Sequence, residues 1–107
     1  MSEAALARGS QELFEELRDD WKSRTRFMSN SAQMATVWSY QQIIGLGPLA
    51  LPWILRELKY ETDHWFWALE AISGENPVPH DQAGQVEESA RAWLEWGHQK
   101  GLIEDVS

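Results

Sequence analysis

Apolar side chains recur along this sequence at intervals of three and four residues, the spacing typical of amphipathic α-helices. The first such side is formed by Leu13, Phe14, Leu17 and Trp21. Ser10 can cap the start of this helix, because its side-chain oxygen can accept a hydrogen bond from a free backbone N–H group. We therefore predict a helix over about residues 10–21, preceded by a disordered segment at residues 1–9.

The same spacing predicts four more helices, at about residues 32–44, 48–60, 64–73 and 83–100. Gly45, Gly74 and Gly101 follow three of them, as glycine often does at the end of a helix. The polar residues 22–31 predict a mobile loop. No segment shows the strict alternation of a β-strand, so we predict an all-α fold of about five helices in a single domain spanning residues 1–107.

Four of the predicted helices have a side that we expect to face the core. In the second helix this side is formed by Met34, Val37, Trp38, Gln41 and Ile44. In the third helix it is formed by Leu51, Ile54, Leu55 and Leu58. In the fourth helix it is formed by Trp65, Ala68, Leu69 and Ile72. In the last helix it is formed by Val86, Ala90, Trp93, Leu94 and Gly97.

The third and fourth helices also carry large aromatic side chains away from these stripes. Trp53 and Tyr60 lie nearly opposite the stripe of the third helix, and Trp67 lies about 200° around the fourth helix from Trp65. A helix that is apolar on two sides needs two neighbours. Either the other helices of this chain cover these aromatic residues, or a partner protein does, since aromatic residues dominate the energetics of protein interfaces.

A stretch in the middle of the chain resembles a HEAT-type helical hairpin. Residues 42–74 contain glycines before the first helix, Pro48 in its first turn and the run ALEAISG in the second helix. More narrowly, YQQIIGLG, LPWILREL, DHWFWALEAISGENPVP and AWLEWG resemble a family of small uncharacterised bacterial proteins, over about residues 38–102. The resemblance implies no activity, cofactor or catalytic residue. Because one helix pair cannot form a solenoid, we expect the flanking N- and C-terminal helices to pack on it.

Charge is spread unevenly along the chain. The formal net charge is −8, from nine basic and seventeen acidic side chains, which argues against direct binding to nucleic acid or to an anionic membrane. Residues 27–55 contain no charged side chain, whereas residues 56–107 contain eleven acids and four bases. The longest apolar run, residues 43–55, is interrupted by glycines and prolines and is too short to span a bilayer. Because the sequence shows no signal-peptide pattern, we expect a cytoplasmic protein without a membrane partner.

The polar residues form no recognisable catalytic or metal-binding pattern. The histidines are His64, His80 and His98, and they lack the spacing of three or four residues at which helical ligands bind a metal. Adjacent carboxylates such as Glu87 and Glu88 point in different directions on a helix and do not converge on a substrate. We interpret the basic run Lys22–Arg26 as a solvated linker rather than a nucleic-acid contact. The sequence therefore predicts no catalytic, metal or cofactor site, and we expect the protein not to be an enzyme.

These features favour a non-catalytic protein-interaction module. We expect an accessory, inhibitory or antitoxin-like partner of another bacterial protein, and self-association into a homo-oligomer stays open. The candidate partner-binding residues are Trp53, Tyr60, Trp67 and Trp96. At least one of Trp53 and Trp67 should be partly accessible to solvent in the isolated chain. The alternative function is an acidic nucleic-acid mimic that inhibits a DNA- or RNA-binding enzyme, since residues 56–107 carry most of the negative charge.

Overall fold

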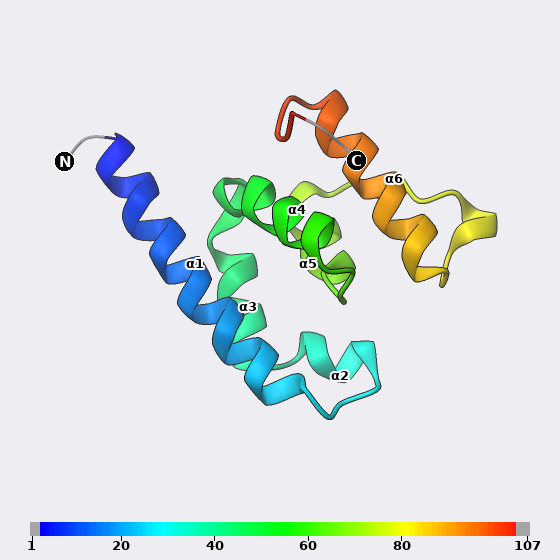
Figure 1. Cartoon of the computed structure of the whole chain (residues 1–107), viewed down its shortest axis with the longest axis horizontal. Coiled ribbons are helices and arrows are strands. Elements are labelled where there is room, and N and C mark those ends of the chain that lie inside the picture. Colours follow the sequence, from blue (N-terminus) through cyan, green and yellow to red (C-terminus); the bar gives the residue numbers. More distant parts are fainter. Residues whose placement is uncertain (1–2, 105–107) are drawn as a thin grey trace.

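A computed structural model describes residues 3–104 as a set of packed helices (Figure 1). In chain order they are α1 (Glu3–Thr25), α2 (Ser31–Ala35), α3 (Trp38–Gly45), the 3-10 turn η1 (Gly47–Ala50), α4 (Leu51–Tyr60), α5 (Phe66–Ser73), the 3-10 turn η2 (His80–Gln82) and α6 (Val86–Gln99). No β-strand occurs among the described residues, and the predicted all-α fold is confirmed.

Helix α1 is longer at both ends than the sequence pattern predicts. It includes residues 3–9, for which we predict disorder, while Met1 and Ser2 lie outside the described residues. Three of these seven residues are alanine, and the leucine, arginine and glutamate among them are also good helix formers. At its other end, α1 continues to Thr25, whose hydroxyl donates a hydrogen bond of 2.7 Å to the carbonyl oxygen of Trp21. The predicted loop at residues 22–31 is therefore limited to residues 26–30.

A break divides the second predicted helix into α2 and α3. Val37 has an extended backbone, with φ −62° and ψ 136°, and neither it nor the preceding Thr36 favours a helix because both are β-branched. Of the predicted side, Met34 is buried and Val37 and Ile44 pack partly buried against the core, but the break resets the helical phase, so Trp38 and Gln41 face outward. Tyr40 and Ile43 are buried instead, whereas Trp38 is 66% exposed.

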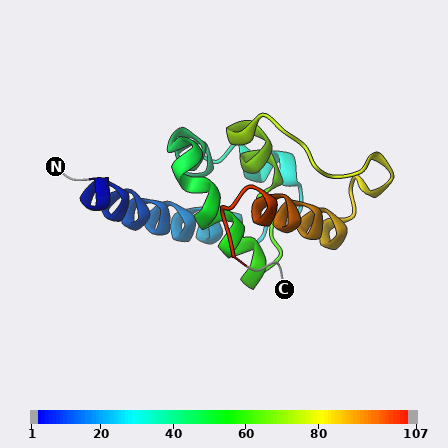
Figure 2. The same ribbon diagram turned by 90° about the horizontal axis from the view of Figure 1, so that it is seen from above.

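The helix pair α4–α5 forms where the resemblance places it, with its predicted stripes in the core. The fully or nearly fully buried residues of the two stripes are Leu51, Ile54, Leu55, Leu58, Trp65, Ala68 and Leu69. Gly74 ends α5 with a positive φ of 73°, a conformation that glycine adopts without steric cost. Figures 1 and 2 show α4 lying between α1 on one side and α6 on the other. The flanking helices therefore cover the pair on two sides, as expected.

An aromatic cluster attaches α1 to the helix pair. Trp65 of the α4–α5 connection has its ring centroid 4.5 Å from that of Trp21 and 6.1 Å from that of Phe14. Tyr40 of α3 stacks on Trp65, with ring centroids 5.9 Å apart and an interplanar angle of 13°. Aromatic pairs of this kind each contribute about 0.5–1.5 kcal/mol beyond the area they bury. Leu13, which we predict on this side of α1, is instead 44% exposed, because the packed side is the narrower one that carries Phe14 and Trp21.

The Tyr40 hydroxyl links α3 to the start of α5 by two hydrogen bonds. It donates to the carbonyl oxygen of His64 at 3.1 Å and accepts from the backbone N–H of Ala68 at 2.9 Å. Burial raises the pKa of Tyr40 well above its ordinary value, because the charged phenolate would lose its hydration. The neutral hydroxyl is thus the form that this packing requires.

Candidate functional site

Two of the four candidate partner-binding residues, Trp53 and Trp96, are core residues in the structure. Trp53 is 9% exposed, because Phe14 of α1 packs on it with ring centroids 5.8 Å apart. Trp96 is 8% exposed and donates a hydrogen bond of 3.3 Å from its indole nitrogen to the Glu75 carboxylate. Both rings are largely covered within the chain, which makes these two residues weaker candidates for an interface than exposed ones.

The other two candidates are exposed. Tyr60, the last residue of α4, is 89% exposed, and Trp67 on α5 is 56% exposed. The expectation that Trp53 or Trp67 is accessible in the isolated chain is therefore confirmed, by Trp67. Pro52, which precedes the buried Trp53, lies in the first turn of α4, where a missing backbone N–H group is tolerated.

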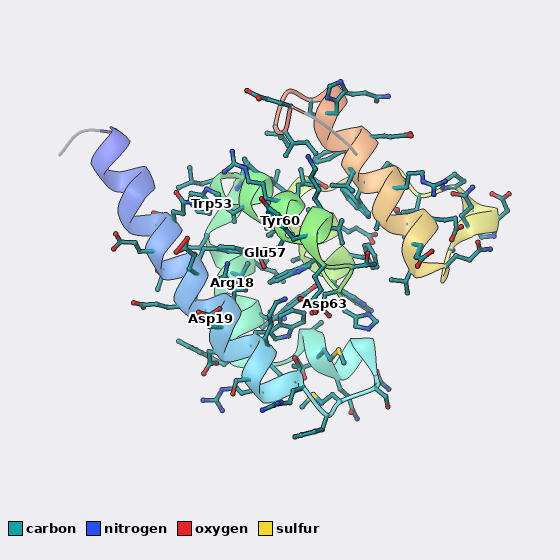
Figure 3. All side chains as sticks on the ribbon, viewed as in Figure 1. Arg18, Asp19, Trp53, Glu57, Tyr60 and Asp63 are labelled. Atoms are coloured by element: carbon teal, nitrogen blue, oxygen red, sulfur yellow. The ribbon has the colours of Figure 1, made fainter. Side chains whose placement is uncertain are left out.

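Ion pairs cross the seam between α1 and the end of α4 (Figure 3). Arg18 of α1 lies 2.9 Å from the carboxylate of Glu57, and Lys22 lies 3.1 Å from that of Glu61 and 3.8 Å from that of Asp63. Lys22 therefore belongs to a helix and has acidic partners, which corrects our interpretation of residues 22–26 as a linker. Ion pairs this close to the surface contribute at most about 1 kcal/mol each.

The neighbouring basic residue Arg24 is also paired within α1. Its guanidinium donates a hydrogen bond of 2.8 Å to the Asp20 carboxylate, one helical turn earlier. This hydrogen bond lowers the pKa of Asp20 below its ordinary value, because it stabilises the ionised form. Arg18, Lys22 and Arg24 thus make contacts inside the chain, which reduces the case for nucleic-acid binding by these residues.

The exposed side of α3 carries an aromatic residue that the sequence analysis places in the core. Trp38 shares this side with Gln41, Gln42 and Gly45, which follow it by three, four and seven positions in α3. We define the uncharged face as Met28, Val37, Trp38, Gln41, Gln42 and Gly45. A hollow of about 630 Å³ is lined by Trp38, Met28, Val37 and the side chain of Arg24 from the last turn of α1. The signal for this surface was present in the sequence, since residues 27–55 contain no charged side chain.

A second hollow is lined by residues of α5, of α6 and of the segment 74–85 that joins them. Figure 2 shows the course of this segment between the two helices. We call the hollow the α5–α6 groove; its volume is about 330 Å³. Its apolar lining consists of Phe66, Val78, Ala83, Val86 and Trp93, and its polar lining includes His64, Glu70, Asn76 and Ser89. Val86, which we predict to face the core, is instead 38% exposed at the start of α6.

The described residues contain no group of three or more histidine, aspartate, glutamate or cysteine side chains placed to hold a metal ion. No helix within residues 3–104 combines the length and the apolar character needed to cross a membrane. Compared with family models, curated proteins and solved structures, the chain matches none of them. The function must therefore be inferred from the surfaces of this chain.

Proposed function

We propose that this protein is a non-catalytic interaction module that binds another protein through the uncharged face. The observation that carries the proposal is Trp38, which is 66% exposed on a side of α3 that carries no charged side chain. Surface residues of a chain with 26 charged side chains are expected to include charges, so their absence over 29 successive residues needs a reason. The cores of protein interfaces are depleted in charge and enriched in tryptophan and methionine, which is the composition found here.

A partner would gain affinity from covering Trp38. An exposed indole ring leaves a large apolar area in water, and its transfer into an interface is favourable by roughly 25 cal/mol per Å². Gln41 and Gln42, on the same side of α3, can supply hydrogen bonds around the ring without the desolvation penalty of a charge. The role that we propose is accessory or inhibitory, because a non-catalytic binding module acts by positioning its partner or by covering a surface of that partner.

The proposal is tested with the tagged full chain and three single variants: Trp38→Ala, Trp67→Ala and Tyr60→Ala. All three side chains are exposed, so their removal should leave the melting temperature nearly unchanged. Proteins captured from the host lysate by the wild-type chain are identified, purified and titrated against each variant. Trp38→Ala should weaken binding by about 2 kcal/mol, which is about 30-fold, whereas Tyr60→Ala on α4 should change it little.

The control variants decide where the interface lies. Equal binding by Trp38→Ala and the wild-type chain would refute the assignment of the interface to the uncharged face. If Trp67→Ala alone weakened binding, the partner would dock on α5 instead. If none of the three variants weakened it, aromatic docking as such would be wrong.

A further inference from the structure

We infer that the uncharged face binds the same face of a second copy of this chain, with the two α3 helices running antiparallel. The inference rests on the proposed function, because it takes the uncharged face as a surface that binds protein and names the occupant. The resulting dimer is two-fold symmetric, so each contact between the two copies occurs twice.

The exposed side of α3 has a large side chain at one end and none at the other. Trp38, at the start of the helix, is 66% exposed. Gly45, at its end, lies seven positions later on the same side, about 10.5 Å further along the helix axis. A Cβ atom added to Gly45 would meet no atom within 4 Å, so the space above this glycine is open within the chain.

This arrangement is complementary to itself when two α3 helices pack antiparallel. Trp38 of one copy then lies opposite Gly45 of the other, where the missing side chain leaves room for the indole ring. At the centre of the contact, Gln41 of one copy lies opposite Gln42 of the other. Gln41 already donates a hydrogen bond of 2.6 Å to the carbonyl oxygen of Ala35, which leaves its own side-chain oxygen to accept one from Gln42 of the other copy.

Charge restricts where two copies can meet. Each chain carries a formal net charge of −8, and like charges opposed across an interface are unfavourable. Helix α3 contains no charged side chain, so a contact between two α3 helices opposes none of its residues to a like charge. Arg24, which lines the hollow beside Trp38, has its guanidinium paired with the Asp20 carboxylate at 2.8 Å. The uncharged face is therefore a place where two acidic chains can approach each other.

The accessible surface of the chain is large enough to lose an interface. A monomeric protein of 12.3 kDa exposes about 6,100 Å² by the usual scaling with mass. This chain exposes 6794 Å², which is roughly 700 Å² more than that scaling gives. A standard protein interface covers about 800 Å² on each partner, so the surplus is similar to the area that one such interface removes from water.

Analytical ultracentrifugation of the purified full chain tests the dimer, which we expect to form at micromolar concentration. Trp38→Ala should weaken it about 100-fold or more, because both copies lose an interface tryptophan. Gly45→Leu should weaken it about 10-fold or more, because the new side chain occupies the place of the other copy's indole ring. The controls Trp67→Ala and Gly9→Leu make the same chemical changes at exposed positions outside the face, and each should change dimerisation less than about 2-fold.

Cross-linking tests the antiparallel register, in a chain that has no cysteine of its own. A mixture of the variants Gln41→Cys and Gln42→Cys should form a disulfide-linked dimer on mild oxidation, because the two positions face each other across the contact. A mixture of Gln42→Cys with Gln11→Cys, whose residue lies exposed on α1, should form far less of it. Added salt should leave the dimer unchanged or strengthen it, because salt screens the repulsion between two acidic chains.

A chain that stays monomeric at about 1 mM, far above the range in which specific dimers form, would overturn the inference. So would a dimer that Gly45→Leu leaves intact, one that Trp67→Ala weakens as much as Trp38→Ala does, or one that dissociates in high salt. If the chain is monomeric and Trp38→Ala still weakens capture of another protein, the inference fails and the proposed function stands. If the chain dimerises as expected and binds no other protein, the proposed function fails and the inference stands.

Discussion

Gly97 lies where α6 meets α4, and its replacement by alanine tests how closely the two helices pack. A Cβ atom at this position would lie 2.5 Å from Leu55 Cδ1 and 3.4 Å from Ile103 Cγ1. Carbon atoms in contact normally lie about 3.5–4.0 Å apart, so the Leu55 methyl group would have to move by about 1 Å or more. Leu55 is fully buried, which leaves its side chain little room to move. Forced overpacking of this kind costs about 1–3 kcal/mol.

The gain in helix propensity works in the opposite direction. Alanine is favoured over glycine inside a helix by up to about 1 kcal/mol, so Gly97→Ala should lower the free energy of unfolding by about 0.5–2 kcal/mol net. Gly9 in α1 provides the matched control, because a Cβ there would meet no atom within 4 Å. Gly9→Ala should therefore raise the free energy of unfolding, by up to about 1 kcal/mol.

Urea denaturation followed by circular dichroism measures both variants against the wild-type chain. The midpoint should fall for Gly97→Ala and rise for Gly9→Ala, with the slope of the transition unchanged in each. If Gly97→Ala were as stabilising as Gly9→Ala, the close approach of α6 to Leu55 would be wrong. A change of slope would instead show that the substitution alters the denatured state or the two-state behaviour.

Three further substitutions and conditions test the core. Tyr40→Phe should lower the free energy of unfolding by about 1–3 kcal/mol, because it leaves the N–H of Ala68 and the carbonyl of His64 without their partner. Tyr60→Phe, at an exposed position, should change the free energy of unfolding little. Equal effects of the two substitutions would contradict the buried hydrogen bonds of Tyr40. The raised pKa of Tyr40 keeps its proton on in the folded state, so its contribution to stability is complete below the ordinary tyrosine pKa of about 10 and is lost as the pH rises above it. Thermal melts between pH 8 and pH 11 should show that decline in the wild-type chain and a smaller one in Tyr40→Phe. Leu58→Ala should cost about 2–5 kcal/mol, and an unchanged melting temperature would mean that the stripe of α4 does not face the core.

The sequence by itself determined which stripes of the hairpin face inward. Leu51, Ile54, Leu55 and Leu58 are buried as predicted, because the helical repeat places residues three, four and seven positions apart on one side whatever surrounds the helix. The end of α5 was equally readable, since Gly74 takes a backbone conformation that other residues avoid. The absence of a charge in residues 27–55 was also visible, although its meaning was not.

Only the tertiary structure decided which aromatic residues are covered. Trp53 and Trp67 both lie away from the core-facing stripes of their helices, so helical spacing predicts the same exposure for both. In the structure, Phe14 of α1 packs on Trp53, whereas Trp67 is 56% exposed. Trp38 was misplaced for a different reason, since weak helix formers at Thr36 and Val37 let the chain turn out of the helix and reset its phase. Helical spacing is a local property of the backbone. The covering of one side chain by another depends on contacts between residues far apart in sequence, and those contacts form only when the whole chain packs.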